Sequence, residues 1–205
     1  MTDYISVPQL RDYIGSDTSN FEAVAASVCR VVSRAVESMC GRNFAAAGTV
    51  AAARSIPTEW RRDLYEHGVY DIATTTDLVI KTDTDGDGTF ETTWTATDYQ
   101  LEPLNGIVSG RDGYPYDRIR AVGDYSFPWL PHGQAALQVT ARWGWVATPD
   151  EVEHAALVGA AELFKGKDAI DGYVGLDGWG PVRIRENPKV RALLGPYMKH
   201  PVSVG

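Results

Sequence analysis

Apolar residues recur at spacings of three and four between residues 17 and 40, and this period predicts one long helix. Ser6, followed by Pro8, predicts a shorter helix before it that ends at Gly15, and Gly41 is expected to end the long helix. The stripe indicates a helix face buried in a core, and it consists of Phe21, Val24, Val28, Val31, Val32, Ala35, Val36 and Met39.

Between residues 50 and 145 the pattern changes to short segments rich in β-branched and aromatic residues, separated by turns. We predict strands near residues 50–56, 77–81, 89–95, 98–102, 117–122 and 135–145. The last segment alternates between an apolar face, Leu137, Val139, Ala141 and Trp143, and a polar face, Gln138, Thr140 and Arg142. A sheet with one buried and one solvated face is therefore expected.

The chain returns to a helical pattern after residue 147. Thr148, Pro149 and Glu151 match a capping box with proline in the first helical position. The apolar face of this helix is expected to pack on the first long helix, and it comprises Val152, Ala155, Ala156, Leu163 and Phe164. A glycine-rich stretch follows, and Asn187 and Pro188 predict the start of a last short helix.

These elements predict an α+β fold: a small helical bundle with an inserted antiparallel β subdomain and an extended C-terminal segment ending in a short helix. We treat the chain as a single domain with four parts. They are N-terminal helices (1–45), a β-rich insert (46–146), a core helix (147–169) and a C-terminal docking segment (170–205).

The stretch KTDTDGDGTFETTW, residues 81–94, is the most motif-like in the chain. Asp83, Asp85 and Asp87, followed by Gly88, match the first half of an EF-hand calcium loop. Position 12 of such a loop requires a bidentate glutamate and is Trp94 here, and the flanking residues favour strands over helices. We therefore interpret the stretch as a turn between strands, and keep a calcium site on the three aspartates as the weaker alternative.

The composition is that of a soluble globular protein, with 44% hydrophobic and 22% charged residues. No apolar run is long enough to span a membrane, and the N-terminal residues lack a signal-peptide pattern. The net charge of −8 is concentrated in residues 57–125, where fourteen Asp and Glu face six Lys and Arg. This acidic bias argues against tight binding of nucleic acid and suits a surface that DNA passes without sticking.

Few residues suggest catalysis. Cys29 and Cys40 lie about 16 Å apart along one predicted helix, too far for a disulfide, and are expected to be core residues. No nucleophile-elbow or phosphate-loop motif is present in the sequence. No histidine has metal-ligand spacing to another histidine, to a cysteine or to a carboxylate motif; the four are His67, His132, His154 and His200. We predict a non-enzyme without cofactor or metal, because no paired acid and base and no metal cluster appears in the sequence.

Aromatic residues on turns favour an interface over an active site. Trp143 and Trp145 are expected in the core, whereas burial is less clear for Trp60, Trp94, Trp129 and Trp179. Glycines make the C-terminal segment costly to order, yet its apolar residues are too many for a linker. The interface candidates are Tyr173, Trp179, Val182, Ile184, Val190, Leu193 and Leu194. In the alternative, Val190, Leu193 and Leu194 pack the last helix on its own bundle.

Several stretches, taken in order, resemble the head-to-tail connector (adaptor) family of long-tailed double-stranded DNA phages. They are ASVCRVVSRAVESMCGRNF (26–44), DIATTTDLVIKTDTDGDGTFETTW (71–94) with DYQLEPLNG (98–106), VTARWGWVATPDEVEHAALVGAAELFKGKDA (139–169) and ENPKVRALLGPYM (186–198). The aspartate-rich turn recurs in that family as a hairpin. Relatives usually carry a basic run after the Leu-Phe of the third helix, and here the run is KGKD, diluted by Gly166.

The resemblance implies a structural virion protein that is assembled in the host cytoplasm and resides in the neck between capsid and tail. Such proteins form a homo-oligomeric ring, usually dodecameric, below the portal protein. The ring extends the DNA channel, passes double-stranded DNA without sequence-specific binding, and offers a platform for the next neck or tail-completion protein. The alternative from another class is a calcium-dependent binding module, for carbohydrate, built on the Asp83–Asp87 turn and exposed tryptophans.

Overall fold

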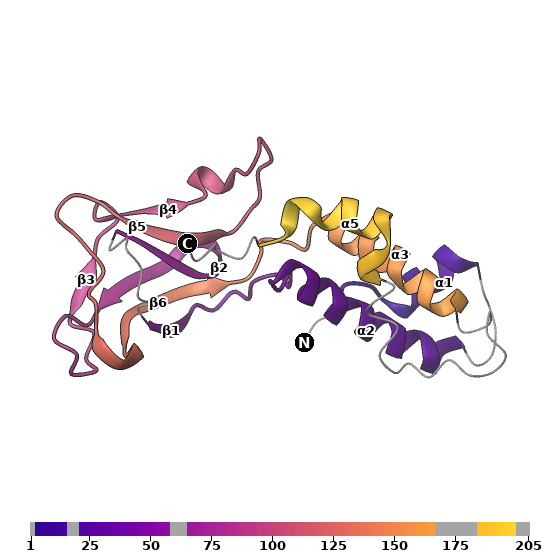
Figure 1. Ribbon diagram of the computed structural model, residues 1–205, viewed down its shortest axis with the longest axis horizontal. Helices are drawn as coiled ribbons and strands as arrows, with labels where there is room; N and C mark the ends of the chain where they lie inside the picture. Colours follow the sequence, from indigo (N-terminus) through magenta and orange to yellow (C-terminus); the bar gives the residue numbers. More distant parts are fainter. Residues whose placement is uncertain (1–2, 16–20, 58–64, 167–183, 200–205) are drawn as a thin grey trace. The chain divides into compact units, whose positions relative to one another are not determined.

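The computed structural model describes residues 3–15, 21–57, 65–166 and 184–199 (Figure 1). It confirms the predicted α+β class. The chain forms two compact units: a helical unit, Met1–Ala45 with Thr148–Gly205, and a β unit, Ala46–Ala147. Within the described ranges, no helix has the length and apolar character needed to cross a membrane.

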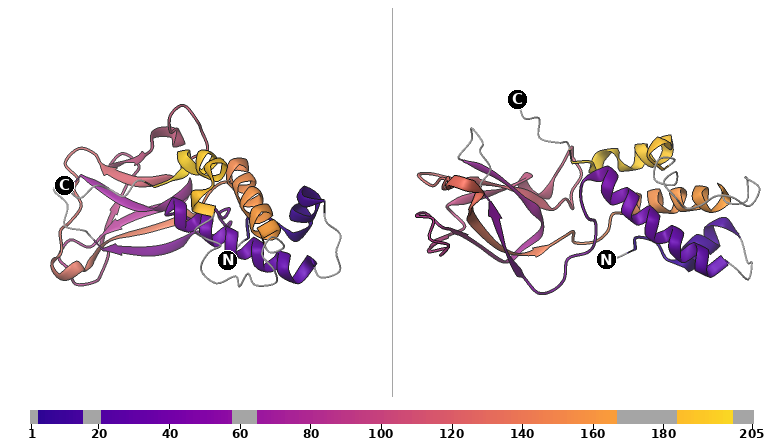
Figure 2. Two further views of the ribbon diagram at one scale, coloured as in Figure 1. Left: turned by 45° about the vertical axis from the view of Figure 1, so that its right-hand side comes forward. Right: turned by 60° about the horizontal axis from the view of Figure 1, so that its bottom comes forward.

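The helical unit contains α1 (Val7–Ile14), α2 (Phe21–Cys40), α3 (Asp150–Gly166), α5 (Pro188–Leu194) and the 3-10 turn η3 (Gly195–Tyr197). Helix α3 contacts α1, α2 and α5, which surround it in Figures 1 and 2. The caps follow the sequence signals: the Ser6 side chain accepts from the Gln9 backbone N–H, and Gly15 and Gly41 end their helices with positive φ.

The apolar faces predicted for α2 and α3 meet in the core of the helical unit. Among the most deeply buried residues are Val28, Val32, Val36, Val152, Ala155, Ala156, Val190 and Leu194. Cys29 and Cys40 are buried, free thiols, as predicted. Gly159 of α3 lies against the Val32 and Ile184 side chains, and a Cβ there would make ordinary van der Waals contact with them at 3.4–3.5 Å.

Helix α3 begins one residue later than the capping pattern predicted. Its first residue is Asp150, and the Pro149 carbonyl accepts hydrogen bonds from the N–H groups of Val152 and Glu153. Pro149 is therefore the cap residue, not the first helical residue. The Thr148 hydroxyl donates to the Phe44 carbonyl at 3.0 Å, which ties the start of α3 to the segment after α2.

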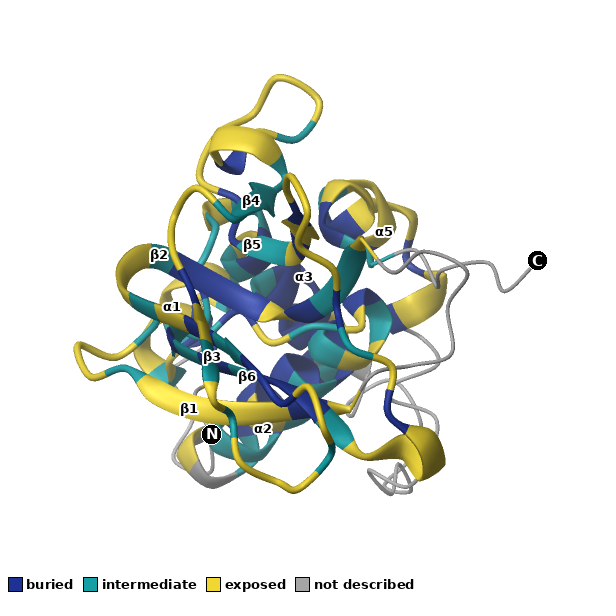
Figure 3. Cartoon of the chain, turned by 90° about the vertical axis from the view of Figure 1, so that its left-hand side faces the viewer, coloured by how far each residue is buried: buried dark blue, intermediate teal, exposed yellow. Residues whose placement is uncertain are grey.

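The β unit is a six-stranded antiparallel sheet of order β1-β6-β2-β5-β4, with β3 paired to β2. The strands are β1 (Ala52–Pro57), β2 (Glu66–Thr82), β3 (Thr92–Trp94), β4 (Tyr99–Glu102), β5 (Tyr116–Ala121) and β6 (Ala135–Trp143). Two 3-10 turns, η1 (Leu104–Gly106) and η2 (Pro131–Gly133), lie in the connections. Figure 3 shows the edge strand β1 largely exposed.

Strand β2 is much longer than the predicted segment 77–81. It starts at Glu66 and exchanges partners along its length, pairing with β5 from Glu66 to Ile72 and with β6 from Ile72 to Thr82. The register shifts along both pairings, and Asp77 has a positive φ of 59° within the strand. Such irregularities bend a sheet and interrupt the alternation of side chains, which hid the first half of β2 from a periodicity search.

The buried face of the sheet confirms the alternation predicted for β6. Leu137, Val139 and Ala141 are fully buried, and Trp143 is half-buried. The sequence leaves the burial of Trp94 open, and the structure shows that this residue is only 5% exposed. Its ring stacks on Phe127 at 4.9 Å between centroids, and its indole N–H donates to the Thr82 hydroxyl at 3.2 Å. Trp94 is therefore a core residue.

Candidate interaction surfaces

The aspartate-rich segment is a turn between antiparallel strands, as predicted, because Thr82 at the end of β2 pairs with Thr92 at the start of β3. Gly86 and Gly88 have φ values of 82° and 88°, a region that favours glycine. The Asp83 carboxylate accepts from the N–H groups of both glycines, at 2.7 and 2.9 Å. The aspartate closes the turn through backbone hydrogen bonds.

The three aspartates, alike in sequence, differ in their surroundings. Asp83 is buried, and its own N–H donates to the Ala136 carbonyl at 3.0 Å. Asp85 and Asp87 are exposed, and each accepts one backbone N–H two residues ahead, at 3.1 and 2.6 Å. Only Asp83 is therefore part of the core that supports the turn.

Glu91 was not among the sequence candidates, yet its carboxylate lies in this cluster. One oxygen each of Asp83, Asp85 and Glu91 can come within 4.8 Å of the others, whereas Asp87 is not in this group. Glu91 accepts from the Thr84 hydroxyl and from its N–H at 2.9 Å, and these bonds lower the pKa of Glu91. Counted from Asp83 as position 1, Glu91 is at position 9 of the loop, which is one of the ligand positions of an EF-hand, and this spacing could have identified it from the sequence.

The donor set for a calcium ion is smaller here than in an EF-hand. Three carboxylates could each supply one oxygen, and position 12 is the buried Trp94. Calcium takes six to eight oxygens, and both Asp83 oxygens already accept backbone hydrogen bonds. The geometry favours a turn that its own hydrogen bonds maintain.

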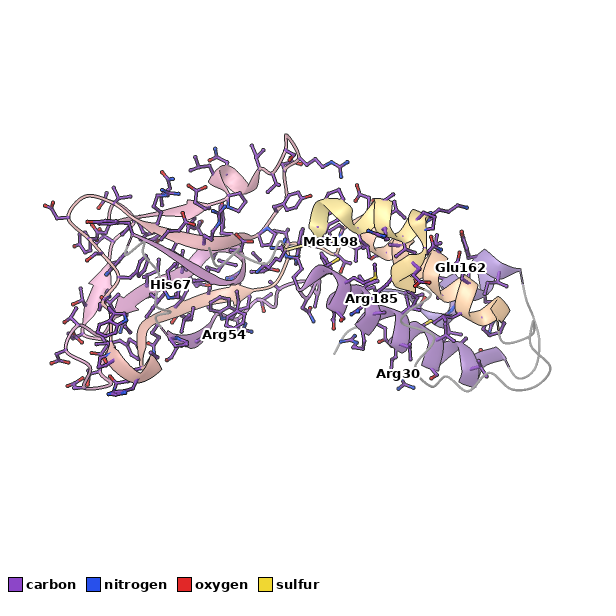
Figure 4. All side chains as sticks on the ribbon, in the orientation of Figure 1. Arg30, Arg54, His67, Glu162, Arg185 and Met198 are labelled. Atoms are coloured by element: carbon purple, nitrogen blue, oxygen red, sulfur yellow. The ribbon has the colours of Figure 1, made fainter. Side chains whose placement is uncertain are left out.

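An arginine stacked on aromatic rings lies on the exposed edge of the sheet. The Arg54 guanidinium of β1 is 4.5 Å from the Trp143 ring centroid and 5.0 Å from that of Tyr70. Arg54 is labelled in Figure 4. The Tyr70 and Trp143 rings meet edge-to-face at 6.0 Å, and the Trp143 indole N–H donates to the Ala52 carbonyl at 2.7 Å. We call Arg54, Tyr70 and Trp143 the arginine stack.

Other arginines of the sheet are neutralised by carboxylates. Glu66 on β2 pairs with Arg118 and Arg120 on β5, at 3.2 and 2.6 Å. Arg142 on β6 pairs with Asp77 on β2 at 2.6 Å. Among the residues that the structure describes, no carboxylate is within 4.0 Å of the Arg54 guanidinium nitrogens, so the arginine stack presents an uncompensated cation.

The interface candidates of the C-terminal segment fall into two groups. Tyr173, Trp179 and Val182 lie outside the described residues. Val190 and Leu194 are buried within the helical unit, as the alternative of packing on its own bundle expected, and Leu193 is half-buried. Ile184, an interface candidate outside that alternative, is buried there as well. The Asn187 side chain caps α5 and accepts hydrogen bonds from the N–H groups of Lys189 and Val190. Helix α5 is therefore a capped helix that packs in the bundle.

Leu193 lines a shallow groove of the helical unit together with Ile5 and Leu157. Acidic side chains of the first turn of α3 rim it, including Asp150 and Glu153. Acidic residues at a helix N-terminus are favourable for the helix dipole, which accounts for them without a ligand.

The histidines remain dispersed in the described structure. The His67 ring contacts Phe127, and its Nδ1 lies 2.8 Å from the Gly68 carbonyl oxygen. His154 is on the surface of α3, where its ring meets Tyr13 edge-to-face, and His132 is exposed in η2. His200 lies outside the described residues. Burial raises the pKa of the Cys40 thiol to about 12, which disfavours a nucleophilic thiolate there.

No family model and no curated protein matches this sequence. Solved structures do match its fold. One is a chain from the virion of a native gene transfer agent (GTA) particle, with a TM-score of 0.54 and 20% identity over 98% of this chain and 93% of that chain. Another is from the neck of the native GTA particle computed with C12 symmetry, with a TM-score of 0.51 and 20% identity over 100% and 97%. At this identity, the matches show that the chains share a fold.

Proposed function

We propose that this chain is a structural virion protein of the neck, a head-to-tail connector. Copies of it form a ring below the portal protein, extend the DNA channel, and provide the platform on which the next neck or tail-completion protein attaches. Assembly takes place in the host cytoplasm, and the finished ring resides between capsid and tail.

The observation that carries the proposal is the similarity in fold to a chain of the GTA neck over almost the full length of both chains. A match that covers both units, the helical and the β-rich, is more specific than a match of one common module would be. The C12 symmetry of that neck makes a ring of twelve copies the natural expectation here.

The charge of the chain is compatible with a channel component. The net charge is −8, and residues 57–125 carry fourteen acidic against six basic side chains. Duplex DNA carries one negative charge per about 1.7 Å of its length, so a surface of the same sign lets it slide without binding. We expect no catalytic step in this role.

Electron microscopy of the purified chain mixed with the portal protein of the same particle tests the proposal. A ring coaxial with the portal, on its outer side, is the expected result, and twelvefold averaging should sharpen it. A chain that remains dispersed in the presence of the portal, or that binds elsewhere on the capsid, would show that it is not a connector.

A further inference from the structure

The arginine stack is built in a way that orients one cation. The Arg54 guanidinium carbon lies over both the Tyr70 and Trp143 rings, which are nearly perpendicular to each other, so the two contacts together hold the cation in place. The Trp143 indole is in turn held by its hydrogen bond to Ala52. A guanidinium stacked on a ring face keeps its N–H groups for an acceptor in its own plane. Arginine, tyrosine and tryptophan are also the residues enriched at the centres of protein interfaces.

The surroundings of the stack favour a carboxylate over a phosphate as the acceptor. The β unit, residues 46–147, has fourteen acidic and eight basic residues and thus a net charge of −6. A duplex would bring a long, continuous row of phosphates against this unit, whereas an acidic turn places only a few carboxylates at the arginine.

A matching acidic turn is present on the same chain. Asp85 and Asp87 are exposed, and no ion pair among the described residues neutralises them. Asp85 also shares its cluster with the carboxylates of Asp83 and Glu91. Like charges this close repel each other, so an incoming cation would be stabilised there.

The acidic turn and the stack of one chain are too far apart to meet. Asp83 is bonded to Ala136 at the start of β6, whereas the Trp143 indole contacts Ala52, which lies opposite Ala141. Five residues of strand separate these positions, roughly 16 Å at about 3.3 Å per residue. An ion pair requires about 4 Å, so the contact can form only between copies.

We propose that the Arg54 guanidinium binds the carboxylates of Asp85 and Asp87 of a second copy of this chain. The inference rests on the proposed ring and names one contact within it. Two different patches meet, so the interface is heterologous, and repetition of it closes a ring when the rotation between copies is a whole fraction of a turn. In the ring, the arginine stack of each copy binds the acidic turn of one neighbour, and its own acidic turn binds the arginine stack of the other neighbour.

Sedimentation velocity of the full chain, at several protein and salt concentrations, tests the contact. The unmodified chain is expected to associate as its concentration rises, and to associate less as salt screens the ion pair. Arg54→Glu should weaken association about tenfold or more, as should Asp85→Lys with Asp87→Lys. Combining these three substitutions reverses both charges and should restore association.

Matched controls separate the contact from general charge and folding effects. Arg191→Glu makes the same charge change at an exposed residue of α5 and should leave association unchanged. Arg54→Gln keeps the side-chain stem over the rings without the charge and should weaken association while the circular dichroism spectrum stays the same. Equal association of Arg54→Glu and the unmodified chain would overturn the proposal, as would a folded triple variant that does not recover.

Other outcomes would also overturn the contact. The first is a chain that stays monomeric at the highest concentration reached. The second is binding of a fluorescent DNA duplex by the unmodified chain that Arg54→Glu abolishes. The third is association that a calcium chelator abolishes but Arg54→Glu leaves unchanged. Imaging separates this inference from the proposed function. A ring on the portal with Arg54 far from the neighbouring turn keeps the connector and refutes the contact, whereas self-association of a chain that never joins the portal refutes the connector alone.

Discussion

Replacing Asp83 by alanine should destabilise the β unit far more than the same change at Asp85. The Asp83 side chain is 1% exposed and accepts two backbone N–H bonds, from Gly86 and Gly88. A hydrogen bond to a charged acceptor contributes about 1.5–3 kcal/mol. Because the glycine N–H groups of the mutant can regain some water, we take the lower end for each bond and expect a loss of about 3 kcal/mol.

Urea unfolding followed by tryptophan fluorescence measures this loss, since Trp60, Trp94, Trp129, Trp143 and Trp145 all belong to the β unit. The experiment is run in chelator, so that bound metal cannot contribute. Asp83→Asn keeps one acceptor oxygen and should cost about half as much as Asp83→Ala. Asp85→Ala is the control and should change the unfolding free energy by about 0.5 kcal/mol or less. Equal losses at the two positions would refute the assignment of Asp83 as the residue that closes the turn.

Three further predictions concern the metal, the pH and the C-terminus. The melting temperature should differ by only a few degrees between calcium and chelator, and a shift of many degrees would make the turn a calcium site. Glu91 should titrate below its ordinary value near 4.5, and Thr84→Ala should raise its pKa. Because the pKa of Glu91 is lower in the folded than in the unfolded chain, its hydrogen bonds to Thr84 stabilise the fold above the unfolded pKa, and this stabilisation is lost as the pH falls through the folded pKa. NMR of the Glu91 carboxyl resonance as a function of pH measures the folded pKa. Truncation after Asp168 removes Val190 and Leu194 from the helical core and should lower its melting temperature in circular dichroism, whereas unchanged melting would return these residues to an interface role.

Local patterns were sufficient for the elements whose neighbours do not change along their length. Helix α2 keeps one face in the core throughout, so its three-four spacing predicted it directly, and the alternation of β6 did the same. The first half of β2 was missed for the opposite reason. Its partner changes from β5 to β6 near Ile72, and no single face of the strand remains buried. That change depends on pairing between distant segments, which no local window contains.

The candidate sites show the same division. The glycines of the acidic turn predicted its backbone, but the inequality of Asp83 and Asp85 depends on the distant Ala136. Glu91 was overlooked because the EF-hand template directs attention to position 12. The arginine stack joins residues from three strands, β1, β2 and β6, so it has no signature in the sequence at all.

The hydrogen bonds at the ends of the β unit have a consequence for how such a chain can be rearranged. The Ala47 N–H donates to the Trp145 carbonyl at 2.7 Å, so the two ends of the β unit are adjacent, and on the helical side the Thr148 hydroxyl binds the Phe44 carbonyl. For a flexible loop the entropic cost of bringing its ends together grows with loop length, but a folded insert whose ends are already adjacent costs the bundle little more than a short loop. The β unit is thus an insertion between two segments of the helical unit. Joining Ala45 to Thr148 through a few glycines should leave a smaller helical protein, containing α1, α2, α3 and α5, that still folds. Other domains with neighbouring termini could be inserted there instead.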